Sequence, residues 1–232
     1  MCRKEANTFI KTHKSSMISL GLAPMLRDKP YWPAHASVLS QPKQWMESHT
    51  QSSILWVHSP KGTRNPSASY AMALLCLHDS SGMDSTIYRF YIQPSQRRIP
   101  KGHTVEEIGT LELLYSLIVQ LLQVDENGDT FEISEEVLRQ LDYTMESYSS
   151  AMSLLKALLQ STKRLKQCII DGINHICLGK GVKLCNELLA TLSEHQRESA
   201  PGLKILLTTT GNFEGLLEHT ELRDPVMTAQ MD

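Results

Sequence analysis

The feature that most constrains the fold is a repeated alternation of short apolar runs with longer helix-like segments. The first run, residues 54–58, is rich in strand-forming residues and is bounded by polar turn residues. Such a run is typical of a strand buried on both faces of a parallel sheet. Similar runs occupy 87–92, 168–171 and 203–209. The chain is therefore expected to form four strands of this kind.

The segments between these runs have helical character. Asn65 and Pro66 are typical of a helix start, and leucines recur on one face of the later segments. Strands that alternate with helices predict an α/β fold with a mainly parallel sheet, helices on both faces and any ligand beyond the carboxyl ends of the strands. The predicted helices span 66–77, 111–123, 149–162 and 182–196, with a further helix opening at 134.

The two ends of the chain lack this alternation. Residues 1–42 contain four prolines, which limit long helices, so we expect an irregular N-terminal arm or leader there. The main domain is expected over 43–218, beginning with a short amphipathic piece around Trp45 that packs on it. Residues 219–232 are expected to form a weakly structured tail, preceded by a short helix near Leu216.

Composition argues against several classes of protein. The formal net charge is -2 and the charges are interspersed, so no strong field draws the chain to nucleic acid. No run of 18 apolar residues occurs, so no membrane span is expected. The five cysteines include no CxxC pair, which favours reduced thiols over a secreted disulfide scaffold. A cytoplasmic protein is expected.

Polar residues follow three of the apolar runs in an arrangement that is suited to phosphate binding. A loop and a helix follow 54–58, Asp171 ends the run at 168–171, and threonines end the run at 203–209. In P-loop NTPases the backbone N–H groups of the first loop hold the phosphates and its Lys neutralises their charge. A Ser or Thr of that loop and a carboxylate at a strand end hold the metal ion.

These segments resemble the nucleotide-binding domain of fungal NACHT-type STAND proteins. The resemblance covers residues 43–218 and implies a three-layer P-loop NTPase-like fold. No single motif is specific, and the order and spacing of the segments carry the resemblance. Residues 44–47 and 52–62 resemble the entry to that domain, 113–122 its helix after the second strand, 168–175 its Walker B segment and 203–209 its sensor strand.

The residues that carry the chemistry of that family are largely replaced. Asn65 stands where the family's Lys is expected, and Pro66 stands where its metal-binding hydroxyl is expected. Asn174 and His175 replace the acids expected after the Walker B carboxylate, and a threonine, 209 or 210, replaces the sensor arginine. A charge pair about 4 Å apart near a surface is worth about 4 kcal/mol. Loss of the Lys therefore removes up to about three decades of triphosphate affinity.

We therefore expect a non-enzymatic interaction or regulatory module on a degenerate NACHT/STAND scaffold, with no catalytic residue, no required cofactor and an unidentified protein partner. An alternative is a divergent signalling switch that binds ATP or GTP with Mg²⁺, in which Lys61 or Arg64 holds the phosphates and Asp171 the metal. A weak nucleoside triphosphatase would belong to this alternative. An accessory protein of a fungal metabolic pathway is a third hypothesis. The candidate nucleotide-binding residues are Ser59, Lys61, Gly62, Thr63, Arg64, Asn65 and Ser67.

Simpler interpretations exist for the same residues. Asp171 would cap a turn with Gly172 rather than bind metal. His175, Cys177 and Cys185 do not have the spacing of a tetrahedral zinc site, so a loop histidine and core thiols are expected instead.

Overall fold

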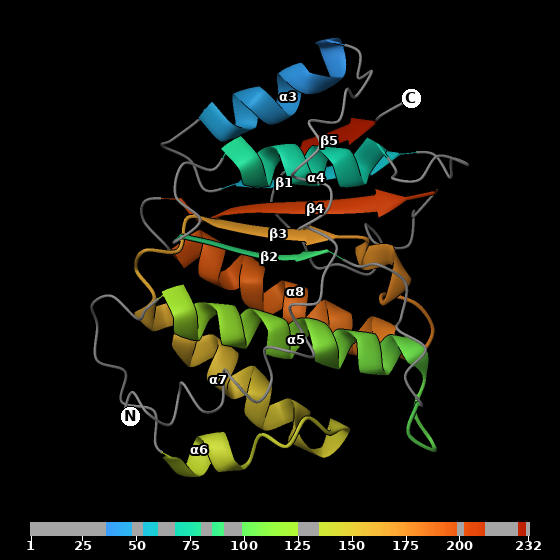
Figure 1. Cartoon of the computed structure of the whole chain (residues 1–232), viewed down its shortest axis with the longest axis vertical. Helices are drawn as coiled ribbons and strands as arrows, with labels where there is room; N and C mark the ends of the chain where they lie inside the picture. Colours follow the sequence, from blue (N-terminus) through green and yellow to red (C-terminus); the bar gives the residue numbers. More distant parts are fainter. Residues whose placement is uncertain are drawn as a thin grey trace.

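The computed structural model describes residues 36–47, 53–59, 68–79, 85–90, 99–124, 135–198, 202–211 and 227–230. These residues contain a five-stranded sheet in the order β2-β3-β4-β1-β5 (Figure 1). Every neighbouring pair is parallel, which confirms the α/β fold and the parallel sheet expected from the sequence. The strands are β1 (Ser53–Ser59), β2 (Thr86–Phe90), β3 (Gln167–Asp171), β4 (Lys204–Thr210) and β5 (Met227–Gln230).

The strand order places β4 at the centre of the sheet, between β1 and β3. Ser59 pairs with Thr210 at the end of β4, and Asp171 pairs with Thr208. The first apolar run and the run that ends in the acid therefore lie in one sheet, and β4 separates their ends.

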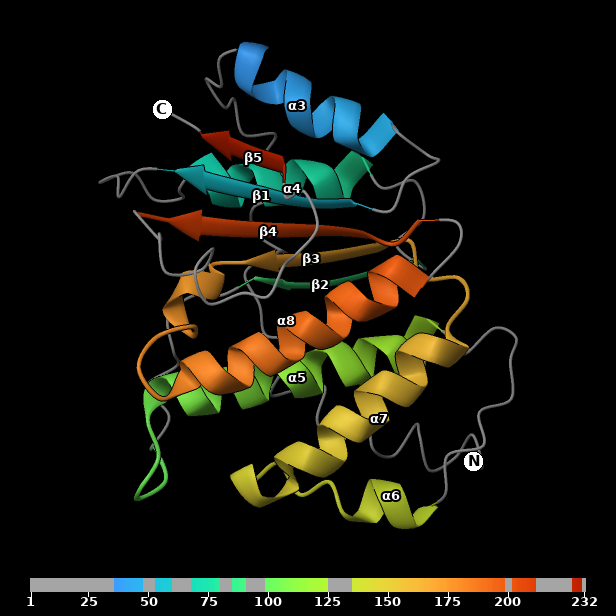
Figure 2. The same ribbon diagram turned by 180° about the vertical axis from the view of Figure 1, so that it is seen from behind.

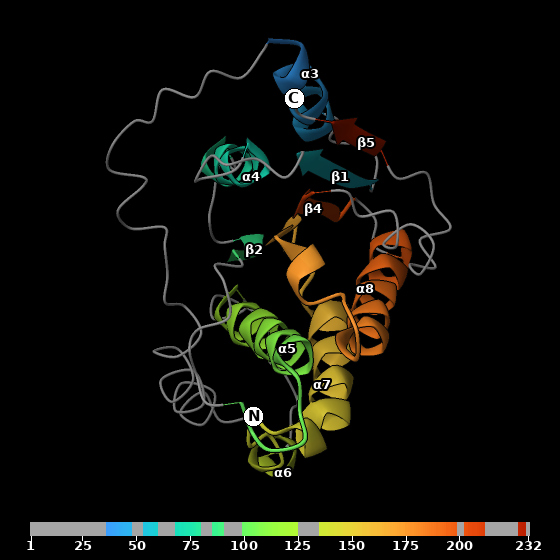
Figure 3. The same ribbon diagram turned by 90° about the vertical axis from the view of Figure 1, so that its right-hand side faces the viewer.

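Helices cover both faces of this sheet, as expected. On one face, α4 (Ala68–Asp79) packs over β1, β3 and β4, and α3 (Ala36–Glu47) packs against β1 and β5. On the other face lie α5 (Val105–Val124) and α8 (Gly181–Glu198), with α7 (Tyr148–Ser161) packed against both of them (Figures 2 and 3). Among the described residues, no helix combines the length and the apolar character needed to cross a membrane.

Strands β1, β3 and β4 read as largely apolar runs because both of their faces are buried. Successive side chains point to opposite faces, so alternate residues enter two separate cores. The core under α4 contains Leu55, Val57, Ile169 and Leu206, whereas the core under α5 and α8 contains Ile54, Trp56, Ile87, Cys168, Ile170, Ile205 and Leu207.

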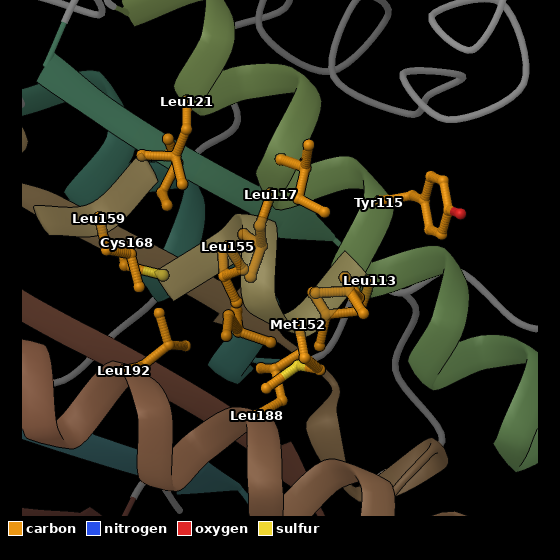
Figure 4. Packing of buried hydrophobic residues seen from close by; sticks show 14 of the residues in the cluster. Leu113, Tyr115, Leu117, Leu121, Met152, Leu155, Leu159, Cys168, Leu188 and Leu192 are labelled. Atoms are coloured by element: carbon orange, nitrogen blue, oxygen red, sulfur yellow. The ribbon is translucent and has the colours of Figure 1, made fainter. Parts of the chain in front are cut away.

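The larger core is centred on α5. Leucines of α5, α7 and α8 point toward one another beside Cys168 of β3 (Figure 4). Fourteen of the 20 residues of α5 are buried, so the leucine face predicted from the sequence is only part of its buried surface. The reason is that β2, α7 and α8 all contact this helix.

Helix α5 begins at Val105, six residues before the predicted start at 111. The backbone N–H of Thr104 donates to Glu107 Oε2 at 2.8 Å, and the N–H of Glu107 donates to Thr104 Oγ1 at 3.3 Å. This reciprocal pair is a capping box, which satisfies two backbone donors at a helix start. The remaining helix predictions agree closely with α4, α7 and α8, and the helix expected from 134 is the short α6 (Glu135–Arg139).

At the outer edge of β2, a side chain of α5 pairs with the backbone of the strand. Gln120 of α5 accepts from the N–H of Tyr88 at 2.9 Å and donates to the Tyr88 carbonyl at 2.7 Å. The amide side chain thus satisfies backbone groups that an added strand would otherwise pair with.

Two elements come from the segments that were expected to be irregular. Helix α3 begins at Ala36 and continues through Pro42, and β5 pairs with β1 inside the predicted tail. The prediction of a weakly structured tail is therefore wrong at 227–230. The short helix expected near Leu216 lies outside the described residues.

A buried lysine fastens α3 to the sheet, and the packing expected around Trp45 is confirmed. Lys204, at the start of β4, donates from Nζ to the Met46 carbonyl at 2.6 Å and also to the Trp45 carbonyl. The same ammonium lies 5.5 Å from the centre of the Trp45 ring, and Trp45 is 1% exposed. A cation at the carboxyl end of a helix also interacts favourably with the helix dipole.

Candidate functional site

Three polar side chains gather where the central strands end. Ser59 ends β1, Thr208 lies near the end of β4 and Asp171 ends β3. They continue the alternate positions that face α4, so all three lie on the α4 side of the sheet. All three are also buried. The carboxyl ends of parallel strands are where open α/β sheets bind ligands.

The innermost contact of this cluster joins Asp171 and Thr208. Thr208 Oγ1 donates a hydrogen bond to Asp171 Oδ1. Thr208 is 0% exposed and Asp171 is 5% exposed. Burial raises the pKa of Asp171 to about 7, although the hydrogen bond from Thr208 acts in the opposite direction. The carboxyl group therefore holds its proton up to near-neutral pH.

The turn after Asp171 is organised by β4. Gly172 adopts a left-handed conformation with φ of 72°, and its N–H donates to the Thr208 carbonyl at 2.9 Å. The expectation that Asp171 itself caps this turn is wrong, because Thr208 supplies the acceptor. Thr208 can accept this hydrogen bond because the register of β3 and β4 places it directly opposite Asp171.

Asn174 has a structural role in the same turn. Its side-chain Nδ2 donates to the Thr210 carbonyl at 3.2 Å, and its Oδ1 accepts from the N–H of Thr210 at 3.3 Å. The amide thus binds the backbone at the end of β4. A carboxylate could accept but could not donate to that carbonyl. Asn174 therefore fits this structural position better than the acid that the family resemblance leads one to expect.

The beginning of α4 is tied to the end of β1. Ser59 Oγ donates to Ser69 Oγ at 3.1 Å, and the Ser59 carbonyl accepts from the N–H of Gly211 at 2.8 Å. Ser59 and Ser69 are 3% and 0% exposed. Residues 60–67, which connect β1 to α4 along the chain, lie outside the described residues.

Tyr70 of α4 belongs to the same cluster and was not singled out from the sequence. Burial raises the pKa of its phenol, and the negative charge of Asp171 raises it further. The phenol is thus close enough to Asp171 to respond to its charge. No motif in the sequence indicates that Tyr70 lies near Asp171, because this depends on how α4 crosses the sheet.

The threonine expected at a sensor position has a partner on the opposite face of the sheet. The indole Nε1 of Trp56 donates to Thr209 Oγ1 at 3.0 Å, and both residues are buried. Thr209 therefore stabilises the pairing of β1 with β4 on the α5 side. It does not belong to the cluster around Asp171.

Of the predicted site residues, Ser59 and Asp171 lie at the carboxyl ends of their strands and on the same face of the sheet. Thr208 lies on β4, the strand between them. Among the described residues, no three His, Cys, Asp or Glu side chains gather as a metal site. Asp171, the predicted metal ligand, is buried and accepts a hydrogen bond from the Thr208 hydroxyl. The other candidates, Lys61, Gly62, Thr63, Arg64, Asn65 and Ser67, lie outside the described residues and stay predictions.

The expected core thiols are confirmed for the described cysteines. Cys76, Cys168, Cys177 and Cys185 are all buried, and none of them forms a disulfide. His175 is exposed in the turn after β3, and the desolvation of its imidazole lowers its pKa.

Comparison with known proteins gives no family with which to interpret this geometry. No family model matches the chain, and no curated protein matches it. The cluster is therefore interpreted from its own residues and contacts.

Proposed function

We propose that this chain is a non-enzymatic interaction or regulatory module, built on a P-loop NTPase-like scaffold of the NACHT/STAND type that has lost its hydrolytic chemistry. The observation that carries the proposal is the environment of Asp171. Its carboxyl group is 5% exposed and is bound by Thr208. In a working P-loop site the equivalent acid helps to hold the metal ion that neutralises the phosphates.

The arrangement of the strands supports the scaffold part of the proposal. Residues 60–67 connect the end of β1 to the start of α4 along the chain, which is the sequence position of a phosphate-binding loop. The acid at the end of β3 lies on the same face of the same parallel sheet. Helices on both faces agree with a three-layer P-loop-like fold.

The sequence of the loop supports the loss of chemistry. Asn65 and Pro66 take the positions expected for the phosphate-binding Lys and the metal-binding hydroxyl. Proline also lacks the backbone N–H that such a loop turns toward phosphate. A scaffold that retains its strands and helices without these groups is suited to binding another protein.

Thermal unfolding with and without nucleotide tests this proposal. Mg-ATP, Mg-GTP and ADP at millimolar concentration should leave the unfolding temperature unchanged and should release no phosphate. A site whose dissociation constant lies about a hundredfold below the ligand concentration would stabilise the fold by about 2.7 kcal/mol. A saturable stabilisation by any of the three nucleotides would contradict the proposal.

The divergent nucleotide switch is the competing hypothesis, and two loop residues distinguish it. Lys61 and Arg64 are the cations of this loop. If a nucleotide does stabilise the chain, the double variant K61A/R64A should abolish the effect under the switch hypothesis. Lys156, an exposed lysine on α7, provides the matched control variant K156A, which should leave any such effect intact.

A further inference from the structure

Two tight turns, which the proposed function does not use, carry the large apolar side chains that are exposed in the described part of the chain. Ile99 directly precedes the turn before α5 and is 40% exposed. Leu178 begins the turn that leads into α8 and is 48% exposed. A single exposed apolar residue is normal on a protein surface, but here both belong to turns of the same kind.

The two turns, residues 100–103 and 178–181, have the same construction. In each, the N–H of the last residue donates to the carbonyl of the first, at 3.2 Å in 100–103 and at 2.9 Å in 178–181. Each contains a glycine with positive φ, 94° at Gly102 and 50° at Gly179. A Cβ added at either glycine would meet no atom within 4 Å, so both turns project into open space.

The helices that follow these turns start side by side, at the end of the molecule where the strands have their carboxyl ends (Figures 2 and 3). Gly181, the first residue of α8, packs directly on Glu106 in the first turn of α5. A Cβ added at Gly181 would lie only 2.6 Å from the Glu106 Cβ. The fold therefore holds the two turns as neighbours on one surface.

This surface is also basic. Lys101 and Lys180 are exposed at central positions of the two turns, and the exposed Lys183 follows in the first turn of α8. No ion pair joins any of these three lysines to another residue that the structure describes. The two acids in the first turn of α5 are partly buried and offset this charge only in part. The local charge is thus opposite in sign to the formal net charge of -2 of the whole chain.

We propose that the paired turns form a peripheral binding surface for an anionic phospholipid bilayer. The lysines would contact the headgroups, while Ile99 and Leu178 enter the interfacial layer between the headgroups and the acyl chains. The proposal rests on the same combination of an exposed aliphatic side chain and an exposed lysine on two neighbouring, projecting turns. It is independent of whether the chain binds nucleotide or a protein.

A bilayer fits this surface better than an acidic protein does. A stable protein interface buries on the order of 800 Å² on each partner and needs complementary shape over that area. Two projecting turns offer separate apolar tips instead, and a fluid interface can adapt to them. Such binding depends on exposed charges, so added salt weakens it.

Co-sedimentation of the full chain with lipid vesicles tests the proposal. We expect binding to phosphatidylcholine vesicles that contain phosphatidylserine, a decrease in that binding as salt is added, and at least about tenfold weaker binding to phosphatidylcholine alone. Equal binding to both kinds of vesicle, or binding to neither, would overturn the proposal. Binding to soluble poly-glutamate but not to the vesicles would also overturn it, in favour of an acidic protein partner.

A double variant tests the role of the charges. K101A/K180A should bind the anionic vesicles about 25-fold more weakly, because each lysine near such a surface contributes about fivefold. K163A/R164A is the matched control, since Lys163 and Arg164 are exposed just before β3, at the amino end of that strand. It should bind as the parent does. An equal loss in both double variants would show that general charge attraction, and not the paired turns, is responsible.

A second double variant tests the apolar side chains. I99S/L178S should bind the anionic vesicles about tenfold more weakly, because less apolar surface enters the interface. Its salt dependence should match that of the parent, since no charge changes. Both positions are exposed, so circular dichroism should be unchanged. Binding of this folded variant as tight as that of the parent would contradict insertion of the two turns.

Discussion

The buried environment of the Asp171 carboxyl group favours its protonated form. The carboxyl group lies beneath α4, with the Thr208 hydroxyl as its hydrogen-bond donor and the Tyr70 phenol close by. Burial of an ionised carboxylate is costly, so the neutral form is favoured. The geometry thus suits a protonated acid that stabilises the junction of β3 and β4.

The stability of the fold should therefore fall as the pH rises through the range between the two pKa values of Asp171. Below about pH 4 the group is protonated in both states, and it imposes no penalty. As the pH rises toward 7 the unfolded chain ionises while the folded chain holds its proton, because the folded pKa is raised to about 7. Above that pH the fold carries a constant penalty on the order of 4 kcal/mol.

Asp171→Asn should remove most of this penalty, because the amide resembles the protonated acid. We expect the variant to be more stable than the parent in urea at pH 8, with a difference that shrinks toward zero at pH 4. Asp142→Asn is the matched control. Hydrogen bonds from Thr144 lower the pKa of the exposed Asp142, so its replacement should not stabilise at pH 8. A D171N variant that is equally destabilised at both pH values would contradict this account.

At the scale of the elements, α3 depends on one side chain from a distant part of the chain. Lys204 binds the last carbonyls of α3 and lies beside the Trp45 ring. The contact joins positions 159 residues apart. Neither segment carries a sequence pattern that predicts this contact, because it depends on the position of α3 at the β1–β5 side of the sheet.

Lys204→Met should loosen α3. The thioether keeps much of the volume of the lysine stem but removes both hydrogen bonds, each of which contributes about 1 kcal/mol or somewhat more when the donor is charged. Hydrogen exchange should show faster exchange of the α3 amides, with β3 and β4 protected as before. Lys156→Met on the exposed side of α7 is the control and should leave α3 unchanged. Equal protection of α3 in K204M and the parent would show that Lys204 does not fasten it.

The backbone at the outer edge of β2 is paired by the Gln120 side chain. Gln120→Leu should leave the N–H and carbonyl of Tyr88 unpaired at the sheet edge, which costs about 1–3 kcal/mol and exposes a template for strand pairing. We expect lower stability in urea and more self-association by light scattering. Gln160→Leu, at an exposed position of α7, adds the same apolar group without opening the edge. Association in Q160L to the same extent as in Q120L would attribute the effect to hydrophobicity alone.

At the scale of the whole molecule, the sequence predicts the class of fold but not how the strands are ordered. Strands buried on both faces leave continuous apolar runs, so β1, β3 and β4 could be located from the sequence. Their order depends on long-range pairing, which no local pattern encodes. β5 was missed because its four residues, Met227–Gln230, pair through the backbone and have no apolar pattern. The start of α5 was missed although its capping box was present in the sequence.

At the candidate site too, the sequence predicts which residues end the strands but not which partners they bind. Ser59 and Asp171 could be placed at strand ends because each follows an apolar run. Their hydrogen-bond partners, Ser69 and Thr208, could not be predicted, because those contacts depend on the crossing of α4 and on the register of β3 with β4.

We propose that the acid at the end of β3 does not take part in binding a metal–nucleotide complex. The most direct measurement is the NMR signal of the Asp171 carboxyl carbon in protein labelled at aspartate, assigned by its absence in D171N. We predict that millimolar Mg-ATP or Mg-GTP leaves this signal in place. A saturable displacement of the Asp171 signal, with the Asp142 signal unchanged, would contradict the claim.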